Sequence, residues 1–476
     1  MTVEDGRPGD PPIALEPNAR TGSAAAATSP TAAASPTAAA SPLAPTGPRF
    51  PALAAFRHRN YRLFFSGQIV SLAGTWMQQV AQAWLVLEIS RDPFWLGVVA
   101  AAQFVPIMIL GLFGGVLADV LPKRQTLVAV QVVMMALAIV LAFLTLSGLV
   151  EVWMIVVLAL LLGCANAVDM PVRHSFAVEM VGRREIGNAV ALNSAMFNGA
   201  RVIGPAVAGL TIGAFGVGLA FVLNAASFVA VIVGLLAMRD RELESPEPTA
   251  RPESPGEVLG QLREGLSYVR QTPLALLAVV VTGLVATFGM NFGVVIPALV
   301  ADVLASDAAG YGFLMAASGT GAFAGALWLA GRRRPRPVFI AVGAIVLGVA
   351  EIGLALSGVF AISLALMLVT GVGMILMAAT ANTTIQLIVP DGLRGRVMSV
   401  YTTVFAGSMP VGGLAAGALA SGIGIEPTIA LGGLLSLVTG LFALAWVRRL
   451  GRLPGLAASS EPGSGQVASL GTARPR

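Results

Sequence analysis

Residues 111–131 read GLFGGVLADVLPKRQTLVAVQ and join two apolar segments, 94–118 and 127–147, through a short turn that carries Lys123 and Arg124. Crossing roughly 30 Å of hydrocarbon takes about 20 apolar helical residues, because every backbone amide must be satisfied within its own helix. Both segments are that long. The stretch is therefore typical of a membrane hairpin, in which two spanning helices meet at a charged turn.

The same pattern continues along the whole chain. Of its 476 residues 56% are hydrophobic and only 11% are charged, and the mean hydropathy is +0.83, whereas soluble domains carry roughly a quarter charged residues. Stretches long and apolar enough to span a bilayer occur twelve times, which predicts an all-α membrane protein with twelve transmembrane helices. The predicted spans are 63–87, 94–118, 127–147, 152–170, 189–215, 218–238, 274–300, 311–330, 338–357, 361–387, 397–422 and 428–447.

The charged residues segregate once these spans are alternated between the two sides of the membrane. One side receives nearly all of the 29 Lys and Arg residues, whereas the other has Arg91 alone, and Arg201 falls inside a span. By the positive-inside rule the Arg-rich side is cytoplasmic. We therefore expect both termini in the cytoplasm and the chain in the inner membrane of a bacterium. The basic turns form no continuous basic face, which argues against a nucleic-acid partner.

Two parts of the sequence repeat each other. At one common shift, glycines of the predicted helices four and five fall on glycines of helices ten and eleven, which predicts two pseudo-repeated six-helix bundles. The matched glycines include Gly163, Gly204 and Gly209, which fall on Gly371, Gly412 and Gly417. The predicted organisation is a disordered Pro/Ala/Ser-rich tail (1–55), an N-terminal bundle (56–238), a connector (239–272), a C-terminal bundle (273–449) and a second disordered tail (450–476).

The connector contains an amphipathic segment. Val258, Leu262, Leu266 and Val269 share one face of a predicted helix, and that face is expected to lie on the inner leaflet. The segment is either a plain tether between the bundles or a sensing helix.

The charged turn quoted at the outset carries a family likeness. From Gly115 through Asp119 to Lys123 and Arg124 it resembles the signature loop between helices two and three of the major facilitator superfamily. The resemblance implies that these four residues act in conformational change, with Asp119 in the gate that holds the outward-facing state. The alternative for Asp119 is an ordinary carboxylate at the membrane surface.

Three further strings resemble one branch of that superfamily. Residues 59–64 (RNYRLF), 71–78 (SLAGTWMQ) and 188–194 (NAVALNS) are similar to the enterobactin-exporter-like branch, also called the transmembrane secretion effector family. The resemblance covers about 56–447 and implies export. Gly204 and Pro205 resemble the Gly-Pro motif associated with antiporters, which implies a conformational role for both.

Polar residues inside the predicted spans are candidates for the substrate cavity. Ser71, Thr75, Gln78 and Gln82 form one stripe along the first helix. An unpaired guanidinium at the depth of Arg201 would cost at least about 2.5 kcal/mol. We expect Thr75, Gln78, Gln82 and Arg201 to line the cavity and to favour cargo with anionic or phenolic oxygens. The alternative is a structural role for the stripe and for Arg201.

Two buried carboxylates are candidates for proton coupling. Asp169 and Glu351 both fall within predicted spans. Asp169 is expected to group with Arg173, one helical turn on. Helix nine, which carries Glu351, belongs to the outer scaffold in the family that the chain resembles, and this weighs against Glu351. The asparagines of the spans are expected to bond between helices; they are Asn166, Asn193, Asn198, Asn291 and Asn382.

These patterns predict a secondary active exporter of a small amphipathic molecule, siderophore-like or drug-like, that works by alternating access and proton antiport. The alternative is an importer of a small metabolite. An enzyme is disfavoured because His58 and His174 belong to no catalytic motif, and Lys123, the only lysine, belongs to no phosphate-binding loop. The expected partners are the cargo, membrane lipid and protons, with no cofactor or metal, and the expected state is a monomer.

Overall fold

The computed structural model describes residues 51–244, 255–332 and 336–450, and within them the side chains of 51–52, 111–120, 183, 255 and 257–259 lie outside the description. Every regular element of the described residues is helical. Most of the two predicted tails also lies outside the described residues. The described chain begins earlier than the predicted boundary at 56, because η1 (Pro51–Arg57) is a short helix whose Ala55 is fully buried.

Five long helices form the first part of the chain. α4 bends at Gly182, whose φ of 70° lies in the left-handed region that favours glycine, so it comprises two successive spans, Val152–Gly182 and Arg184–Phe215. The elements are α1 (Arg59–Ser90), α2 (Pro93–Val120), α3 (Lys123–Leu146), α4 (Val152–Phe215) and α5 (Val217–Leu236).

The second part of the chain holds the remaining helices. The predicted span 274–300 is interrupted, because α7 ends at Phe288 and α8 begins at Phe292. The elements are η2 (Asp240–Glu242), α6 (Pro255–Gln271), α7 (Pro273–Phe288), α8 (Phe292–Ala298), η3 (Leu299–Val303), α9 (Ala308–Ala330), α10 (Val338–Ala355), α11 (Phe360–Ile388), α12 (Asp391–Ile423) and α13 (Ile425–Leu450).

Eleven helices of the described residues are long and apolar enough to cross a membrane. The sequence predicted twelve, and the difference is the predicted span 63–87, which lies within α1. α1 has 32 residues, but Ser71, Gln78 and Gln82 and their polar neighbours lower its hydropathy.

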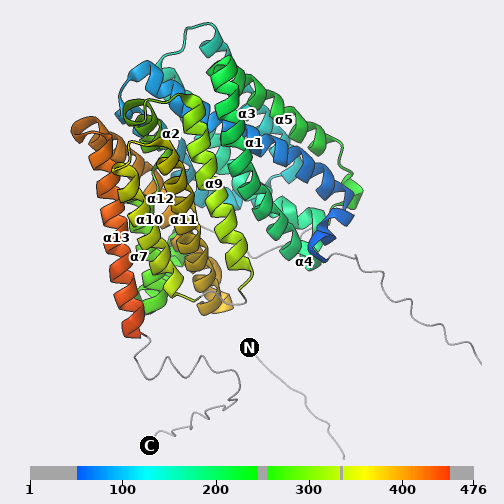
Figure 1. Cartoon of the computed structure of the whole chain (residues 1–476). Coiled ribbons are helices and arrows are strands. Elements are labelled where there is room, and N and C mark those ends of the chain that lie inside the picture. The colour runs from blue at the N-terminus through cyan, green and yellow to red at the C-terminus, as the bar shows by residue number, and fades with distance from the viewer. Residues whose placement is uncertain (1–50, 245–254, 333–335, 451–476) are drawn as a thin grey trace, which may run out of the picture. The chain divides into compact units, whose positions relative to one another are not determined.

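The helices pack in two groups that follow the chain order (Figure 1). In the N-terminal group α1 packs on α4 and α5, and α2 and α3 pack on α4. In the C-terminal group α10 packs on α13 and α11, and α7 packs on α12 and α13. The groups meet mainly where α2 packs on α12 and where α4 packs on α9.

The contacts between the groups are closest at one end of the helices. We call it the Arg91 end, after the turn at 91–92, and the other the Lys123 end, after the turn at 121–122. Near the Arg91 end, a Cβ added at Gly312 of α9 would lie 2.6 Å from Gly209 Cα of α4. Toward the Lys123 end, a Cβ added at Gly187 or Gly395 would meet no atom of the described part of the chain within 4 Å. The groups are thus in backbone contact at the Arg91 end.

The amphipathic helix α6 packs on the C-terminal group. Val269 is 1% exposed, Leu262 packs against the core, and Leu266 is 38% exposed. Tyr268 donates a hydrogen bond to the carbonyl of Ile388 at 3.2 Å. Part of the face that was expected on the lipid therefore lies on protein, while the side chain of Val258 is outside the described residues.

Candidate functional site

Arg201 lies at the seam between the two helix groups. It projects from the second half of α4, with Nη2 3.3 Å from Met374 Sδ of α11 and Cζ 5.7 Å from the ring centroid of Trp76 on α1. A guanidinium has five N–H donors, and within the described residues its partners are only this thioether and this ring. The side chain is half-buried. It can therefore still donate to an anionic or phenolic oxygen.

The polar stripe of α1 divides into residues with different partners. Thr75 donates back to the carbonyl of Ser71 at 2.9 Å. Gln78 accepts a hydrogen bond at 2.5 Å from Nδ2 of Asn224 on α5, so it joins two helices of the N-terminal group. Gln82 is buried. The α1 residue that contacts Arg201 is Trp76.

Gly204 and Pro205 lie about one turn beyond Arg201 and mark two close helix approaches. A Cβ added at Gly204 would lie 2.5 Å from Trp76 Cβ and 2.7 Å from the carbonyl oxygen of Ala73, so a side chain there would push α1 away. The carbonyl oxygen of Pro205 lies 2.5 Å from the position of a Cβ on Gly312 of α9. The pair therefore holds α4 against one helix of each group.

The basic turn at the Lys123 end is bound within the N-terminal group. Lys123 forms an ion pair with Glu179 of α4. Arg124 donates from Nε to the carbonyl of Leu235 at 2.8 Å and from Nη2 to that of Leu236 at 2.9 Å, and it pairs with Asp240. A cation thus binds carbonyls of the last turn of α5. Gly115 and Asp119 lie in α2, within the stretch 111–120 whose side chains are outside the description.

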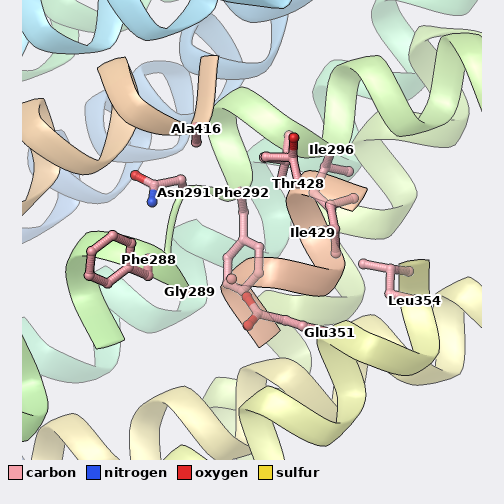
Figure 2. A pocket seen from close by; sticks show the side chains of 12 residues that line it. Phe288, Gly289, Asn291, Phe292, Ile296, Glu351, Leu354, Ala416, Thr428 and Ile429 are labelled. Atoms are coloured by element: carbon pink, nitrogen blue, oxygen red, sulfur yellow. The ribbon is translucent and has the colours of Figure 1, made fainter. Parts of the chain in front are cut away.

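The two candidate proton carriers have different surroundings. Asp169 is fully buried and forms an ion pair with Arg173, as the sequence predicted, and it accepts a hydrogen bond at 2.9 Å from Gln131 of α3. Glu351 of α10 is 4% exposed and forms no ion pair with any described residue. It lines a cavity of about 20 Å³ with residues of the α7–α8 break and of α13 (Figure 2). Asp169 is thus balanced by a half-buried cation, whereas Glu351 faces no cation among the described residues.

Comparison with known sequences decides the family. Residues 50–462 match the profile of the family described as transmembrane secretion effector. The chain belongs to this family. The transmembrane secretion effector family groups with the major facilitator superfamily transporters, which agrees with the resemblance seen in the sequence and shows that this member is a transporter and not an enzyme.

Curated relatives of this family member are transporters. The chain is 25% identical over 393 residues to the uncharacterized MFS-type transporter YfiS of Bacillus subtilis, covering 80% of this chain and 91% of YfiS. It is 27% identical over 383 residues to the multidrug efflux pump Tap of Mycolicibacterium fortuitum, covering 78% of this chain and 92% of Tap. It is 26% identical over 191 residues to the staphyloferrin A transporter of Staphylococcus aureus, covering 40% and 48%.

Solved structures share the fold. A bacterial homolog of the human lysosomal transporter Spinster, in an inward-facing and unoccupied conformation, superposes with a TM-score of 0.64 at 12% identity, covering 82% of this chain and 97% of that one. A peptide transporter POT superposes with a TM-score of 0.65 at 14% identity, covering 83% and 95%. The helices of this family member are therefore arranged in the major facilitator fold.

Proposed function

We propose that this protein is a secondary active exporter of a small amphipathic molecule, working by alternating access and proton antiport. The observation that carries the proposal is Arg201, a half-buried cation at the seam between two helix groups, with N–H donors that no described residue fills. The names of two relatives, a multidrug efflux pump and a staphyloferrin A transporter, support drug-like or siderophore-like cargo.

The proposed topology has twelve spans with both termini in the cytoplasm of a bacterial cell. α1 is the twelfth span, because its 32 residues are long enough to cross the bilayer and Gln78 of its polar stripe bonds to α5. The Lys123 end is cytoplasmic by the positive-inside rule. With the groups in contact at the Arg91 end, the conformation described is then the one closed to the outside. A cysteine placed at Gly331 that reacted only with reagent outside the cell would overturn this topology.

The proposed cavity includes Thr75, Gln82 and Arg201, and Gln78 supports it through its bond to α5. Arg201 recognises an oxygen anion of the cargo. A hydrogen bond to a charged group is worth about 1.5–3 kcal/mol, which corresponds to roughly a 10- to 150-fold change in affinity.

Two dyes on the same ring scaffold test the cargo class. Fluorescein is a phenolic anion, and rhodamine 6G is a cation of similar size. In proteoliposomes with a proton gradient, Arg201→Gln is expected to reduce fluorescein transport at least tenfold, Arg201→Lys less, and neither to reduce rhodamine 6G transport. Unchanged transport of both dyes in Arg201→Gln contradicts a cargo-binding role. Wild-type transport that survives collapse of the gradient contradicts proton antiport, and uptake into cells down the same gradient favours the importer.

A further inference from the structure

Between α7 and α8 the backbone of the C-terminal group is not helical, at a depth that lies inside the membrane. The break covers Gly289, Met290 and Asn291, which is about 24 Å along the helix from its first residue, Pro273. Asn291 Nδ2 donates to the carbonyl of Thr287 at 2.7 Å. Non-helical backbone at this depth is tolerated only where it is buried in protein or lines a wet cavity. The break therefore marks a site with polar chemistry.

A carboxyl group lies against this break. Glu351 Oε2 is buried, has no hydrogen-bond partner among the described residues, and lies 3.1 Å from the position that a Cβ on Gly289 would take. Ser436 Oγ of α13 reaches the same position, where it interacts with the Glu351 carboxyl. Because Gly289 has no side chain, α10 and α13 can both present a polar atom to the broken backbone.

The cavity beside Glu351 is small and mixed in character. Its volume of about 20 Å³ is enough for one water molecule. Figure 2 shows the Glu351 carboxyl beside Phe292 and Gly289, with the Asn291 amide on the far side of Phe292. Its polar lining comes from Asn291, Glu351 and Thr428, and its apolar lining includes Phe288, Phe292 and Leu354.

No cation faces Glu351 from the elements around it. It is the one titratable side chain on α7, α8, α10 and α11. On α13 the charges are confined to the ends, with Glu426 in the first turn and Arg448 and Arg449 in the last. On α12 Tyr401 is directed elsewhere, since its hydroxyl donates to the carbonyl of Ala378 at 3.3 Å. An ionised carboxylate without a cation is costly at this depth, so the site suits a carboxyl group that can hold a proton.

We propose that Glu351 and the α7–α8 break form the proton-binding site of the transport cycle. When α7 and α8 move and water enters the cavity, the carboxyl O–H bond breaks and the proton passes to that water, leaving a hydrated carboxylate beside the break. When protonation is restored, the neutral acid lets the break close over it. This inference rests on the proposed proton antiport and assigns its coupling residue, whereas Asp169 with its cation keeps one charge state.

The test compares Glu351→Gln with Glu426→Gln, which replaces the same kind of carboxyl side chain at an exposed position of α13. Proteoliposomes are assayed with rhodamine 6G in two ways, transport driven by a proton gradient and dye exchange without a gradient. Exchange needs only the dye-bound states, so a folded but uncoupled protein retains it. We expect Glu351→Gln to lose driven transport at least tenfold while exchange continues, and Glu426→Gln to keep both.

Each other outcome overturns a named statement. Suppose that wild-type transport depends on the gradient and that Glu351→Gln retains the same gradient-driven transport as Glu426→Gln. Glu351 is then not the coupling residue, and the proposed antiport stands. If wild-type transport survives collapse of the gradient, the antiport and the coupling role both fail. Should Glu351→Gln lose exchange as well, dicyclohexylcarbodiimide, which modifies protonated carboxyls in apolar surroundings, is applied to the wild type. Modification of Glu351 that slows as pH rises supports the site, and absence of modification overturns it.

Discussion

Replacing Gly312 with alanine is expected to push the two helix groups apart at the Arg91 end. The new Cβ would lie 2.5 Å from the carbonyl oxygen of Pro205 and 2.6 Å from Gly209 Cα, where ordinary contacts begin at 3.4 Å. Both atoms belong to the backbone, so α4 and α9 must separate by about 0.8–0.9 Å (3.4 − 2.6 and 3.4 − 2.5). Overpacking of this kind costs about 1–3 kcal/mol. That free energy shifts an equilibrium about 5- to 150-fold, away from the conformation closed at this end.

Distances between spin labels measure this shift. After Cys164→Ala removes the native cysteine, labels are attached at Leu149 and Leu356, which are 60% and 82% exposed and belong to different helix groups at the Arg91 end. Gly312→Ala is expected to increase the fraction with a long distance. Gly199→Ala on α4 is the matched control, because a Cβ there meets nothing within 4 Å. Equal distance distributions in the two variants would refute the reasoning that backbone contact holds this end closed.

Two further predictions concern stability, measured by thermal unfolding in detergent. Asp169→Asn removes the ion-pair partner of Arg173, whose side chain is 21% exposed, and is expected to destabilise the fold by about 1–3 kcal/mol. Most of the loss is expected to be recovered when Arg173→Gln is added, and a loss that the second change does not reduce contradicts the pairing. Gly182→Ala places a side chain at a φ of 70° and 2.6 Å from a carboxylate oxygen of Glu244, so a loss of at least about 1–2 kcal/mol is expected, and a neutral result would show that the bend relaxes.

The fold was predictable because the length of an apolar stretch and the charges that flank it can be read from one segment at a time. The two features that were missed interrupt such segments without changing their composition. Gly182 bends α4 between two spans. The second of these spans was predicted to start at 189, but the helix already begins at Arg184. The break at 289–291 lies within an apolar run, so hydropathy and periodicity predict one continuous span there.

The candidate site was predictable only where partners are close in sequence. Asp169 and Arg173 are four residues apart on one helix, so their pairing follows from helical geometry and is confirmed. Asn224, the partner of Gln78, is 146 residues away from it, and only helix packing brings them together. The expectation of bonds between helices is wrong for Asn166, Asn198, Asn291 and Asn382. The first three each donate to the carbonyl four residues earlier, and Asn382 accepts from Gln386 on its own helix. Short amide side chains can form such local bonds.

The polar stripe of α1 also constrains how the protein is made. As the proposed twelfth span, α1 is the first of them to leave the ribosome, and it is the long helix whose own hydropathy falls short of a self-sufficient span. The turn at Arg91 and Asp92 joins it directly to the more apolar α2. On the proposed topology, integration into the bilayer is expected to proceed pairwise, with α2 retaining α1 until α4 and α5 are synthesised and shield its glutamines from lipid. The polar residues proposed for the transport pathway would then also set the order of biogenesis.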